Sequence, residues 1–362
     1  MKKPVTRTFG ILTSGGDCPG LNAAIRGVAK AAYFTYNMTV IGISEGYRGL
    51  IEGNARLLKP EDFSGILTQG GTILGTSREK PFKMDKNSPK DSSLGRQKPE
   101  VIVENYRRLN LDCLVVLGGN GTHKTANLLK QEGLNIIGLP KTIDNDIWGT
   151  DVTFGFHSAV DIATEAIDRL HSTAHSHNRV MVIELMGHKA GWLALYAGIS
   201  GGGDVILIPE IPYSMEAISR HLLKRARSGK QFSIVVVAEG AVSEEEIKNP
   251  KAKKKQNPYY SKGQEVAEEI ANVSGMETRL TVLGYLQRGG TPSPYDRLLS
   301  TLFGTTATDL MAAGDFGKMV ALEGSQIITR PLEEVAGKLK QVPLDHPLIR
   351  TARNIGTCLG DE

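Results

Sequence analysis

Short apolar runs recur along the chain and are separated by longer amphipathic stretches. The runs are rich in Val and Ile and lack polar alternation, which is typical of strands buried on both faces. They read TFGILT, MTVIGIS, DCLVVLGG, LNIIGLP, RVMVIELMG, DVILIPE, FSIVVVAEG and RLTVLGY. Stretches such as GLNAAIRGVAKAAYF, THKTANLLKQEG and HSAVDIATEAIDRLHSTAHS lie between them and predict helices. This alternation predicts an α/β fold with mostly parallel sheets covered by helices on both faces.

The length of 362 residues exceeds the usual size of a single core, so we expect two lobes. One sheet is expected before about residue 154 and a second sheet after it, with part of the chain returning late to the first lobe. Two polar segments, 79–100 and 244–264, are expected to be surface excursions from the lobes. The lysine cluster in the second segment is expected to face solvent. Ligands of parallel sheets collect beyond the carboxyl ends of the strands, which makes the loops there the candidate site.

Composition narrows the class of protein. The net charge of +4 is small against 43 basic and 39 acidic residues, which argues against a dedicated nucleic-acid binder. Three scattered cysteines, Cys18, Cys113 and Cys358, suit reduced thiols better than disulfides or a zinc site. No signal peptide is apparent, and no apolar run approaches the ~20 residues of a membrane span. We expect a soluble, cytoplasmic, globular protein.

Three glycine-rich turns each follow a predicted strand. They are TSGGDCPGLNAA, LGGNGTHKT and MGHKAGW, and the first two lead into predicted helices. Glycine lets the backbone approach a ligand closely, and the N–H groups of a helix N-terminus attract phosphate. One such turn alone would be compatible with a simple tight turn. Repeated turns beside clustered acids predict a phosphate-binding site.

The segment GLPKTIDNDIWGTD, residues 138–151, follows a predicted buried strand and gathers a cation, a hydroxyl and two carboxylates. If the loop alternates in orientation, Asp144 and Asp146 share one face while Asn145 points away. Two adjacent carboxylates repel, so one could have the raised pKa of a general base. Alternatively, one carboxylate could bind Mg²⁺, or both could cap the turn locally. Lys141 and Thr142 weigh against a purely local role.

Four arginines flank predicted strand ends or glycine turns, namely Arg78, Arg179, Arg279 and Arg288. The planar guanidinium group suits phosphate oxygens. Each arginine alone could form an ordinary surface ion pair. Together they suggest an anionic substrate with more than one phosphate.

Six long motifs resemble the 6-phosphofructokinases in order and spacing, from about residue 9 to residue 321. They are GILTSGGDCPGLNAAIRG, GTSR, LGGNGT, GLPKTIDNDIWGTD, RLHSTAHSHNRVMVIELMG and TVLGYLQRGGTPSPYDR. The resemblance implies a two-domain α/β enzyme of glycolysis, usually a homotetramer. It implies Mg²⁺-dependent phosphoryl transfer to the 1-hydroxyl of fructose 6-phosphate, giving fructose 1,6-bisphosphate. It also implies a donor-phosphate lobe, 1–154 plus about 287–337, and a sugar-phosphate lobe, 155–286 plus about 338–362.

Carried over position by position, the resemblance implies a role for each site residue. Asp144 looks like the base that takes the 1-hydroxyl proton, with Lys141 as its catalytic neighbour. The residues that look like sugar-phosphate contacts are Thr142, Asp144, Asp146, Met186, Gly187, Glu239, Tyr285 and Arg288. Arg179 and Arg279 look like the arginines that reach the 6-phosphate from a neighbouring subunit, which implies at least a dimer. The donor-phosphate site is expected at Gly16, Arg78, Gly118, Gly119, Asn120, Gly121 and Thr122.

The chain also departs from the family pattern. Asn120 stands where the family usually has an Asp that helps to hold Mg²⁺, although an amide still offers one oxygen ligand. Gly121 leaves room for a nucleotide and favours ATP, whereas Lys141 is typical of pyrophosphate-using members. This pair of residues resembles a mixed-substrate subgroup. We expect ATP as the donor, with pyrophosphate as the alternative, and Tyr285 to replace a frequent His beside the sugar.

Other functions and the regulation stay open. A nicotinamide-nucleotide or lipid kinase with a related glycine turn is disfavoured by the sugar-site motifs. A non-catalytic sugar-phosphate-binding subunit draws support only from Asn120. Where related bacterial enzymes carry a basic effector cluster, this chain keeps Arg26 but has Lys30, His171 and Gln231, so we expect weak or absent control of that type.

Overall fold

A computed structural model describes residues 4–83, 98–249 and 260–361. Most of the predicted excursion at 79–100 and the lysine cluster at 251–255 lie outside the described residues. The chain divides into two compact units, which we call unit 1 and unit 2. Unit 1 comprises Met1–Thr142, Ile147–Ser158 and Arg288–Leu339, and unit 2 comprises Ile143–Asp146, Ala159–Gln287 and Lys340–Glu362.

Unit 1 is built on a seven-stranded sheet with the order β11-β10-β5-β4-β1-β2-β3. The five inner strands are parallel, and the two edge strands, β3 and β11, are antiparallel to their neighbours. The strands are β1 Thr8–Ser14, β2 Thr39–Ile43, β3 Ala55–Leu58, β4 Cys113–Gly118, β5 Ile136–Pro140, β10 Lys318–Glu323 and β11 Gln326–Pro331.

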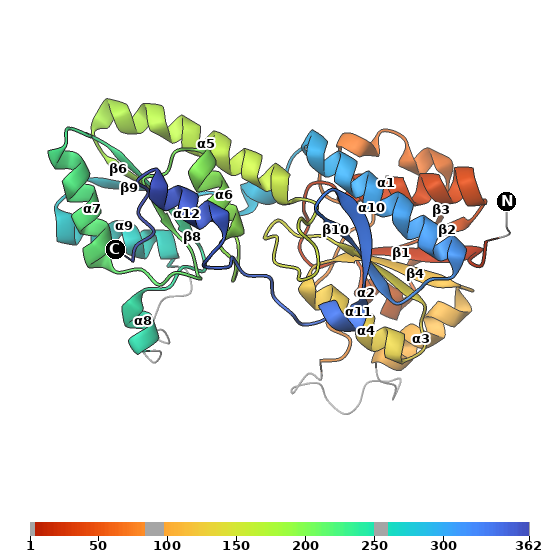
Figure 1. The fold of residues 1–362 in the computed structure, drawn as a ribbon. Coiled ribbons are helices and arrows are strands. Elements are labelled where there is room, and N and C mark those ends of the chain that lie inside the picture. Colours follow the sequence, from red (N-terminus) through yellow and green to blue (C-terminus); the bar gives the residue numbers. More distant parts are fainter. Residues whose placement is uncertain (1–3, 84–97, 250–259, 362) are drawn as a thin grey trace. The chain divides into compact units, whose positions relative to one another are not determined.

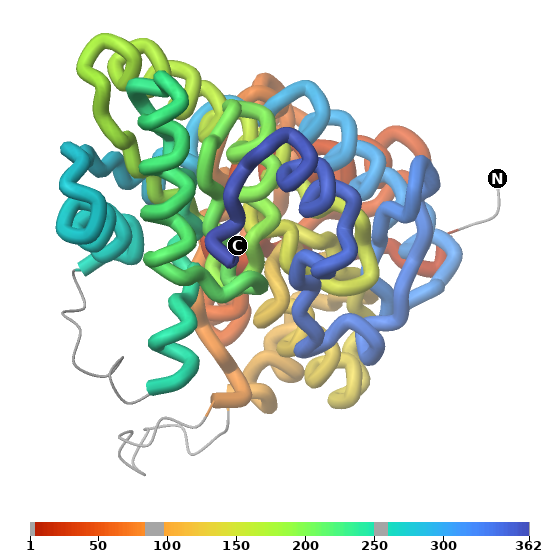
Figure 2. Tube along the Cα trace, turned by 60° about the vertical axis from the view of Figure 1, so that its left-hand side comes forward, coloured from red at the N-terminus to blue at the C-terminus, as the bar shows by residue number. Residues whose placement is uncertain are grey.

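Helices cover both faces of this sheet (Figure 1). Helices α1 and α10 pack together on one face although they come from opposite ends of the chain, as Figures 1 and 2 show. On the other face α2 contacts α3 and α4 contacts α11. The helices are α1 Leu21–Ala31, α2 Tyr47–Glu52, α3 Lys98–Arg108, α4 Asn120–Gln131, α10 Pro294–Ala313 and α11 Leu332–Val335, with short turns η1 Ala32–Tyr36, η2 Pro60–Phe63 and η3 Ile66–Thr68.

Unit 2 contains a parallel four-stranded sheet with the order β7-β8-β6-β9. Alternate residues of β6 and β8 pack against α7 and α9 on one face, and their neighbours are buried on the other face. Burial on both faces explains why the strands read as unbroken apolar runs. The elements are α5 Phe156–His177, which begins in unit 1, β6 Val180–Leu185, α6 Trp192–Ser200, β7 Val205–Leu207, α7 Met215–Arg227, β8 Ser233–Ala238, α8 Glu244–Lys248, α9 Lys262–Ser274, β9 Thr278–Val282, η5 Gly284–Arg288 and α12 Pro347–Asn354.

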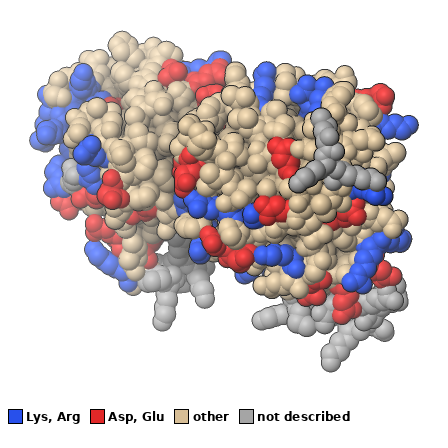
Figure 3. Space-filling view, turned by 45° about the vertical axis from the view of Figure 1, so that its right-hand side comes forward, with Lys and Arg blue, Asp and Glu red and all other residues tan. Residues whose placement is uncertain are grey.

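The predicted α/β fold with two mostly parallel sheets is confirmed, and every predicted strand is present. The sequence patterns did not reveal β3, β10 or β11. Strands β3 and β11 are half-exposed edge strands, which carry a weaker apolar signal than inner strands. None of the helices in the described residues is long and apolar enough to cross a membrane. Basic and acidic side chains are interspersed over the face seen in Figure 3, as the small net charge suggests.

Candidate active site

The first glycine turn of unit 1 follows β1 and is braced by the segment that carries Arg78. Gly15 has a φ of 94°, a conformation that glycine adopts without strain. Its N–H donates to the Ser77 carbonyl at 2.9 Å, and Thr76 Oγ1 donates to the Gly15 carbonyl at 2.7 Å. These bonds place the backbone of Arg78 next to the turn.

The second glycine turn follows β4, the neighbour of β1 in the sheet. A Cβ on Gly118 would lie 2.3 Å from the Cβ of Thr122, so only glycine fits there. Thr122 Oγ1 donates to the Ser14 carbonyl at 3.3 Å, and the hydroxyl of Tyr47 donates to the Thr122 carbonyl at 3.1 Å. The two turns are therefore hydrogen-bonded to each other at the carboxyl edge of the sheet.

Both turns lead into helix N-termini whose N-cap residue is a glycine and makes no side-chain cap. Helix α1 starts after Gly20 and helix α4 after Gly119. Uncapped N–H groups at a helix N-terminus bind phosphate oxygens well, and the helix dipole adds to the attraction. This edge of unit 1 is therefore suited to a ligand that carries phosphates.

Two cations meet at Gly16 in the first turn. Lys141 follows β5 and is only 4% exposed; its N–H donates to the Gly118 carbonyl at 3.0 Å, and its ammonium donates to the Gly16 carbonyl. A Cβ on Gly16 would lie 2.4 Å from Nη1 of Arg288, so the guanidinium rests against this glycine. An anion bound at the turn would meet both positive charges.

Asn120, the first residue of α4, uses the two ends of its amide differently. Nδ2 donates to the Lys338 carbonyl at 2.7 Å, and a carbonyl acceptor requires the NH₂ end there. Oδ1 is buried and has no hydrogen-bond partner among the described residues. Such an oxygen fits as one ligand of Mg²⁺. The described residues hold no cluster of three or more His, Cys, Asp or Glu side chains for a metal.

His123, which the sequence analysis did not single out, lies beneath the second turn. It is fully buried, and its Nδ1 lies 3.0 Å from the Gly119 carbonyl. A Cβ on Gly138 of β5 would lie 2.7 Å from the imidazole ring, so the ring packs directly on that strand. Burial lowers the pKa of His123 to about 4. The neutral ring therefore supports the turn against the sheet.

The carboxylate segment Ile143–Asp146 groups with unit 2. Asn145 has a φ of 51°, so the segment is not extended and the expected alternation of Asp144 and Asp146 about Asn145 does not apply. Asn adopts this left-handed conformation more readily than most residues other than glycine. The Asp146 carbonyl accepts the Lys340 N–H at 2.9 Å. Thr142, just before the segment, is buried in unit 1, where its carbonyl accepts Thr153 Oγ1 at 2.8 Å.

The loops after β6 and β8 bring three predicted sugar contacts together in unit 2. The N–H of Met186 donates to Gln287 Oε1 at 2.9 Å. Gly187 has a φ of 144°, and the N–H of His188 donates to Glu239 Oε1 at 2.9 Å. Because β6 and β8 are adjacent parallel strands, these loops lie at one carboxyl edge.

Arg179 and Arg279 lie at the opposite edge of the same sheet. Arg179 directly precedes β6, and both arginines pair with Glu277, the Arg179 pair at 3.0 Å. These arginines, Arg179 first, lower the pKa of Glu277. At about 3.3 Å per residue, Arg179 and Met186 are separated by roughly 20 Å along β6. Within unit 2, the arginines are not brought to the Met186 loop.

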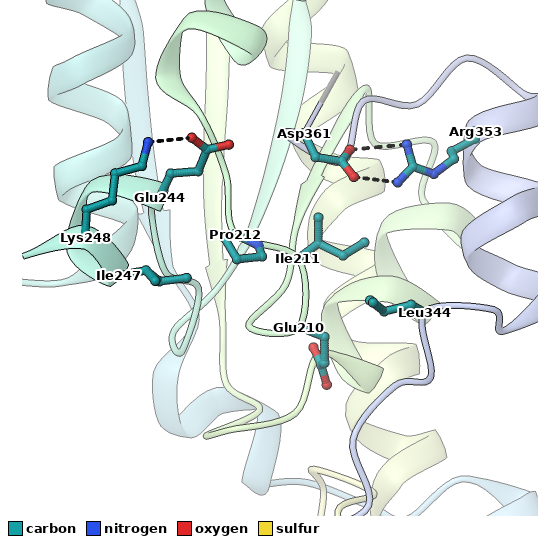
Figure 4. Close-up of a pocket in the computed structure, with 9 residues that line it drawn as sticks. All are labelled: Glu210, Ile211, Pro212, Glu244, Ile247, Lys248, Leu344, Arg353 and Asp361. Atoms are coloured by element: carbon teal, nitrogen blue, oxygen red, sulfur yellow. Dashed lines mark hydrogen bonds and ion pairs between the residues drawn. The ribbon is translucent and has the colours of Figure 1, made fainter. Parts of the chain in front are cut away.

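The remaining predicted contact, Tyr285, is 74% exposed in η5. Unit 2 also contains a cavity of about 420 Å³ between α8, the segment after β7 and the C-terminal segment (Figure 4). Its lining includes the ion pairs Glu244–Lys248 and Arg353–Asp361 and none of the predicted site residues. The carboxylate of Glu210, which also lines the cavity, accepts the N–H groups of Gly191 and Val342 instead of pairing with a cation of the lining.

Comparison with known proteins gives a consistent result. The phosphofructokinase family model matches residues 8–311. An ATP-dependent 6-phosphofructokinase of Spirochaeta thermophila is 73% identical over all of both chains. An ATP-dependent 6-phosphofructokinase 3 of Bacteroides thetaiotaomicron is 56% identical over 97% of this chain and 99% of its own.

Solved structures show the same architecture. The phosphofructokinase of Pichia pastoris in the T-state has a TM-score of 0.80 and 34% identity over 91% of this chain, which spans only 35% of that longer chain. A pyrophosphate-dependent phosphofructokinase of Marinobacter aquaeolei has a TM-score of 0.77 over 98% of this chain and 88% of its own, but at 23% identity it shares the fold alone. With its glycine turns, clustered cations and full-length relatives, this chain belongs to the phosphofructokinase family.

Proposed function

We propose that this chain is an ATP-dependent 6-phosphofructokinase, which transfers the terminal phosphoryl group of ATP to the 1-hydroxyl of fructose 6-phosphate. The observation that carries the proposal is the 73% identity, over both complete chains, to a relative named for that activity. The two hydrogen-bonded glycine turns of unit 1, with Lys141 and Arg288 at Gly16, support it.

In this proposal unit 1 holds the donor. The turns offer the backbone N–H groups of Gly16 and of residues 119–121, and Arg78, Lys141 and Arg288 neutralise phosphate charge. In phosphoryl transfer the protein contributes mainly by positioning the reactants and by stabilising negative charge, because its side chains take little part in covalent chemistry. A Cβ on Gly121 would meet no atom within 4 Å, which leaves space at the start of α4 for a nucleotide.

Unit 2 holds the acceptor in the same proposal. Asp144 takes the proton of the 1-hydroxyl, while Met186, Gly187, Glu239 and Asp146 orient the sugar phosphate, with Tyr285 as a further contact. Thr142 and Arg288, which belong to unit 1, are assigned to the sugar phosphate by family resemblance. General-base catalysis of this kind contributes about 10²–10⁴-fold to the rate.

Arg179 and Arg279 serve the 6-phosphate of a neighbouring copy. Their place at the edge opposite Met186 supports this assignment, because a side chain cannot span roughly 20 Å. The proposal therefore includes a homo-oligomer, a dimer at least and a tetramer by family resemblance.

Mg²⁺ completes the proposed donor site. When bound with the donor, Mg²⁺ supplies positive charge to the phosphate oxygens. Asn120 offers it one neutral oxygen. The positive charge that the chain itself brings to the donor comes from Arg78, Lys141 and Arg288.

Pyrophosphate is the second candidate donor, and the position of Lys141 favours it. The ammonium lies at the Gly16 carbonyl, where it would neutralise a compact and highly charged donor. The position of the Lys141 ammonium and the open space at Gly121 together support the assignment of this chain to the mixed-substrate subgroup of the family. Reaction with pyrophosphate would run near equilibrium, whereas reaction with ATP would be effectively one-way.

The test is fructose 1,6-bisphosphate formation from fructose 6-phosphate and Mg²⁺ with ATP or pyrophosphate as the donor. Turnover with ATP is expected. Asp144→Ser should lose about 10²–10⁴-fold in kcat while fructose 6-phosphate still binds by calorimetry. Asp161→Ser removes an exposed carboxylate from α5 and should match the wild type. Turnover with pyrophosphate alone would select the second donor, and no turnover with either would favour a non-catalytic sugar-phosphate-binding subunit.

A further inference from the structure

Lys340 is fixed in unit 2 by contacts from its backbone and from its side chain. Its N–H donates to the Asp146 carbonyl at 2.9 Å. Its carbonyl accepts Trp192 Nε1 at 3.0 Å, and its ammonium lies 5.3 Å from the centre of the Trp192 ring. The same ammonium donates to Asn145 Oδ1 at 2.9 Å. One residue thus joins the carboxylate segment to the start of α6.

The residues after Lys340 extend this attachment. Gln341 Nε2 donates to the Lys189 carbonyl at 3.4 Å, and the N–H of Val342 donates to Glu210 Oε1 at 2.9 Å. Glu210 in turn accepts the N–H of Gly191, which ends the loop that begins with Met186. The segment 340–342 therefore runs along the loop that holds the proposed sugar contacts.

The contact with Asn145 bears directly on Asp144. Asn145 is 2% exposed and has a φ of 51°, a conformation that most residues adopt only at a cost in free energy. The φ of Asn145 sets how the backbone continues from Asp144, so a contact that holds Asn145 also restrains the backbone that carries the Asp144 side chain. A hydrogen bond from an ammonium group is stronger than one between neutral groups.

We propose that Lys340 is a positioning residue that holds the Asn145 turn and thereby aims Asp144 at the acceptor hydroxyl. The inference rests on the proposed function, in which Asp144 is the base. Lys340 acts through Asn145 and is assigned no contact with the sugar. A misplacement of about 1 Å at a reacting group costs on the order of 10²-fold in rate.

The first test replaces the ammonium alone. Lys340→Met keeps the length and the apolar stem and should lower kcat by about 10- to 100-fold, while KM for fructose 6-phosphate changes less than about threefold. Lys340→Arg keeps a charged donor and should recover most of kcat. Lys338→Met is the matched control: its ammonium lies over the Trp148 ring in unit 1, and kcat should stay near the wild-type value.

The second test approaches the contact from the other side. Asn145→Gly accepts the positive φ and removes the acceptor, so it should reproduce the loss in kcat. Combined with Lys340→Met it should cost no more than either change alone, because both remove one interaction. Additive losses would overturn the inference, as would a wild-type kcat in Lys340→Met, an effect on KM alone, or an equal loss in Lys338→Met.

Hydrogen exchange gives a readout that is independent of turnover. Amides of residues 143–148 should exchange faster in Lys340→Met than in Lys338→Met or the wild type, and unchanged exchange would contradict the positioning role. A wild-type protein that shows no turnover with either donor would overturn the proposed function, and exchange would then decide the role of Lys340 separately.

Discussion

Gly16→Ala is expected to damage activity while sparing stability. The added Cβ would lie 2.4 Å from Nη1 and 2.9 Å from Cζ of Arg288, so the guanidinium must retreat by about 1 Å to reach an ordinary contact distance of 3.4 Å. A displacement of that size in a charge-stabilising group costs on the order of 10²-fold in rate. The clash involves the far end of a flexible side chain, which moves at little cost in folding free energy.

The free energy of unfolding should even rise slightly in this variant. Gly16 does not have a positive φ. Replacing such a glycine with alanine stabilises a protein by about 0.4–1 kcal/mol, because the unfolded chain has less conformational entropy to lose on folding. Activity and stability are thus expected to change in opposite directions. A variant that lost both together would indicate general damage to the turn.

Steady-state turnover with ATP and fructose 6-phosphate, together with urea unfolding, measures both quantities. Gly133→Ala is the control, because Gly133 has a φ of 91° with open space around it: alanine there should cost about 1–2 kcal/mol of stability and leave kcat unchanged. Wild-type kcat and KM in a folded Gly16→Ala protein would refute the argument that Arg288 is held against Gly16 for the reaction.

Three further predictions concern α4 and its first turn. His123 has a pKa of about 4 against a usual 6.5, so its contribution to stability is complete above pH 6.5 and is lost as the pH falls toward 4. Between pH 6.5 and pH 5 the free energy of unfolding, measured in urea titrations, should fall by about 2 kcal/mol more in the wild type than in His123→Phe. Equal losses in the two proteins would contradict the assignment. Gly121→Asp places a carboxylate in the open space at the start of α4. It should raise KM for ATP at least tenfold, with less effect on any reaction with pyrophosphate. An unchanged KM for ATP would contradict the argument that Gly121 leaves room for the nucleotide. Asn120→Asp replaces the group that donates to the Lys338 carbonyl with an acceptor. The free energy of unfolding, measured by denaturation at neutral pH, should fall by about 1–3 kcal/mol. An unchanged free energy of unfolding would mean that this hydrogen bond contributes nothing to stability.

The sequence alone was sufficient for the class of fold and for the position of the glycine turns after β1 and β4. Strands buried on both faces must be apolar throughout, so β1, β4, β5, β6 and β8 were visible as uninterrupted runs. Glycine turns directly after such strands pointed to the carboxyl edge of the sheet, where Gly16 and Gly118 are found. These features are local, because a strand and the turn that follows it are encoded by adjacent residues.

Features that depend on distant partners were decided only by the tertiary structure. The amide of Asn120 is oriented by a carbonyl 218 positions away, and the side chain of Asn145 by an ammonium 195 positions away. No local pattern marked Lys340 or His123, since lysine and histidine occur commonly without such roles. The expected alternation around Asn145 failed for the same reason: its positive φ accompanies a long-range contact that the sequence of the loop does not contain. Periodicity reports which faces of an element are buried, whereas the orientation of a polar side chain follows from the groups that folding brings to it.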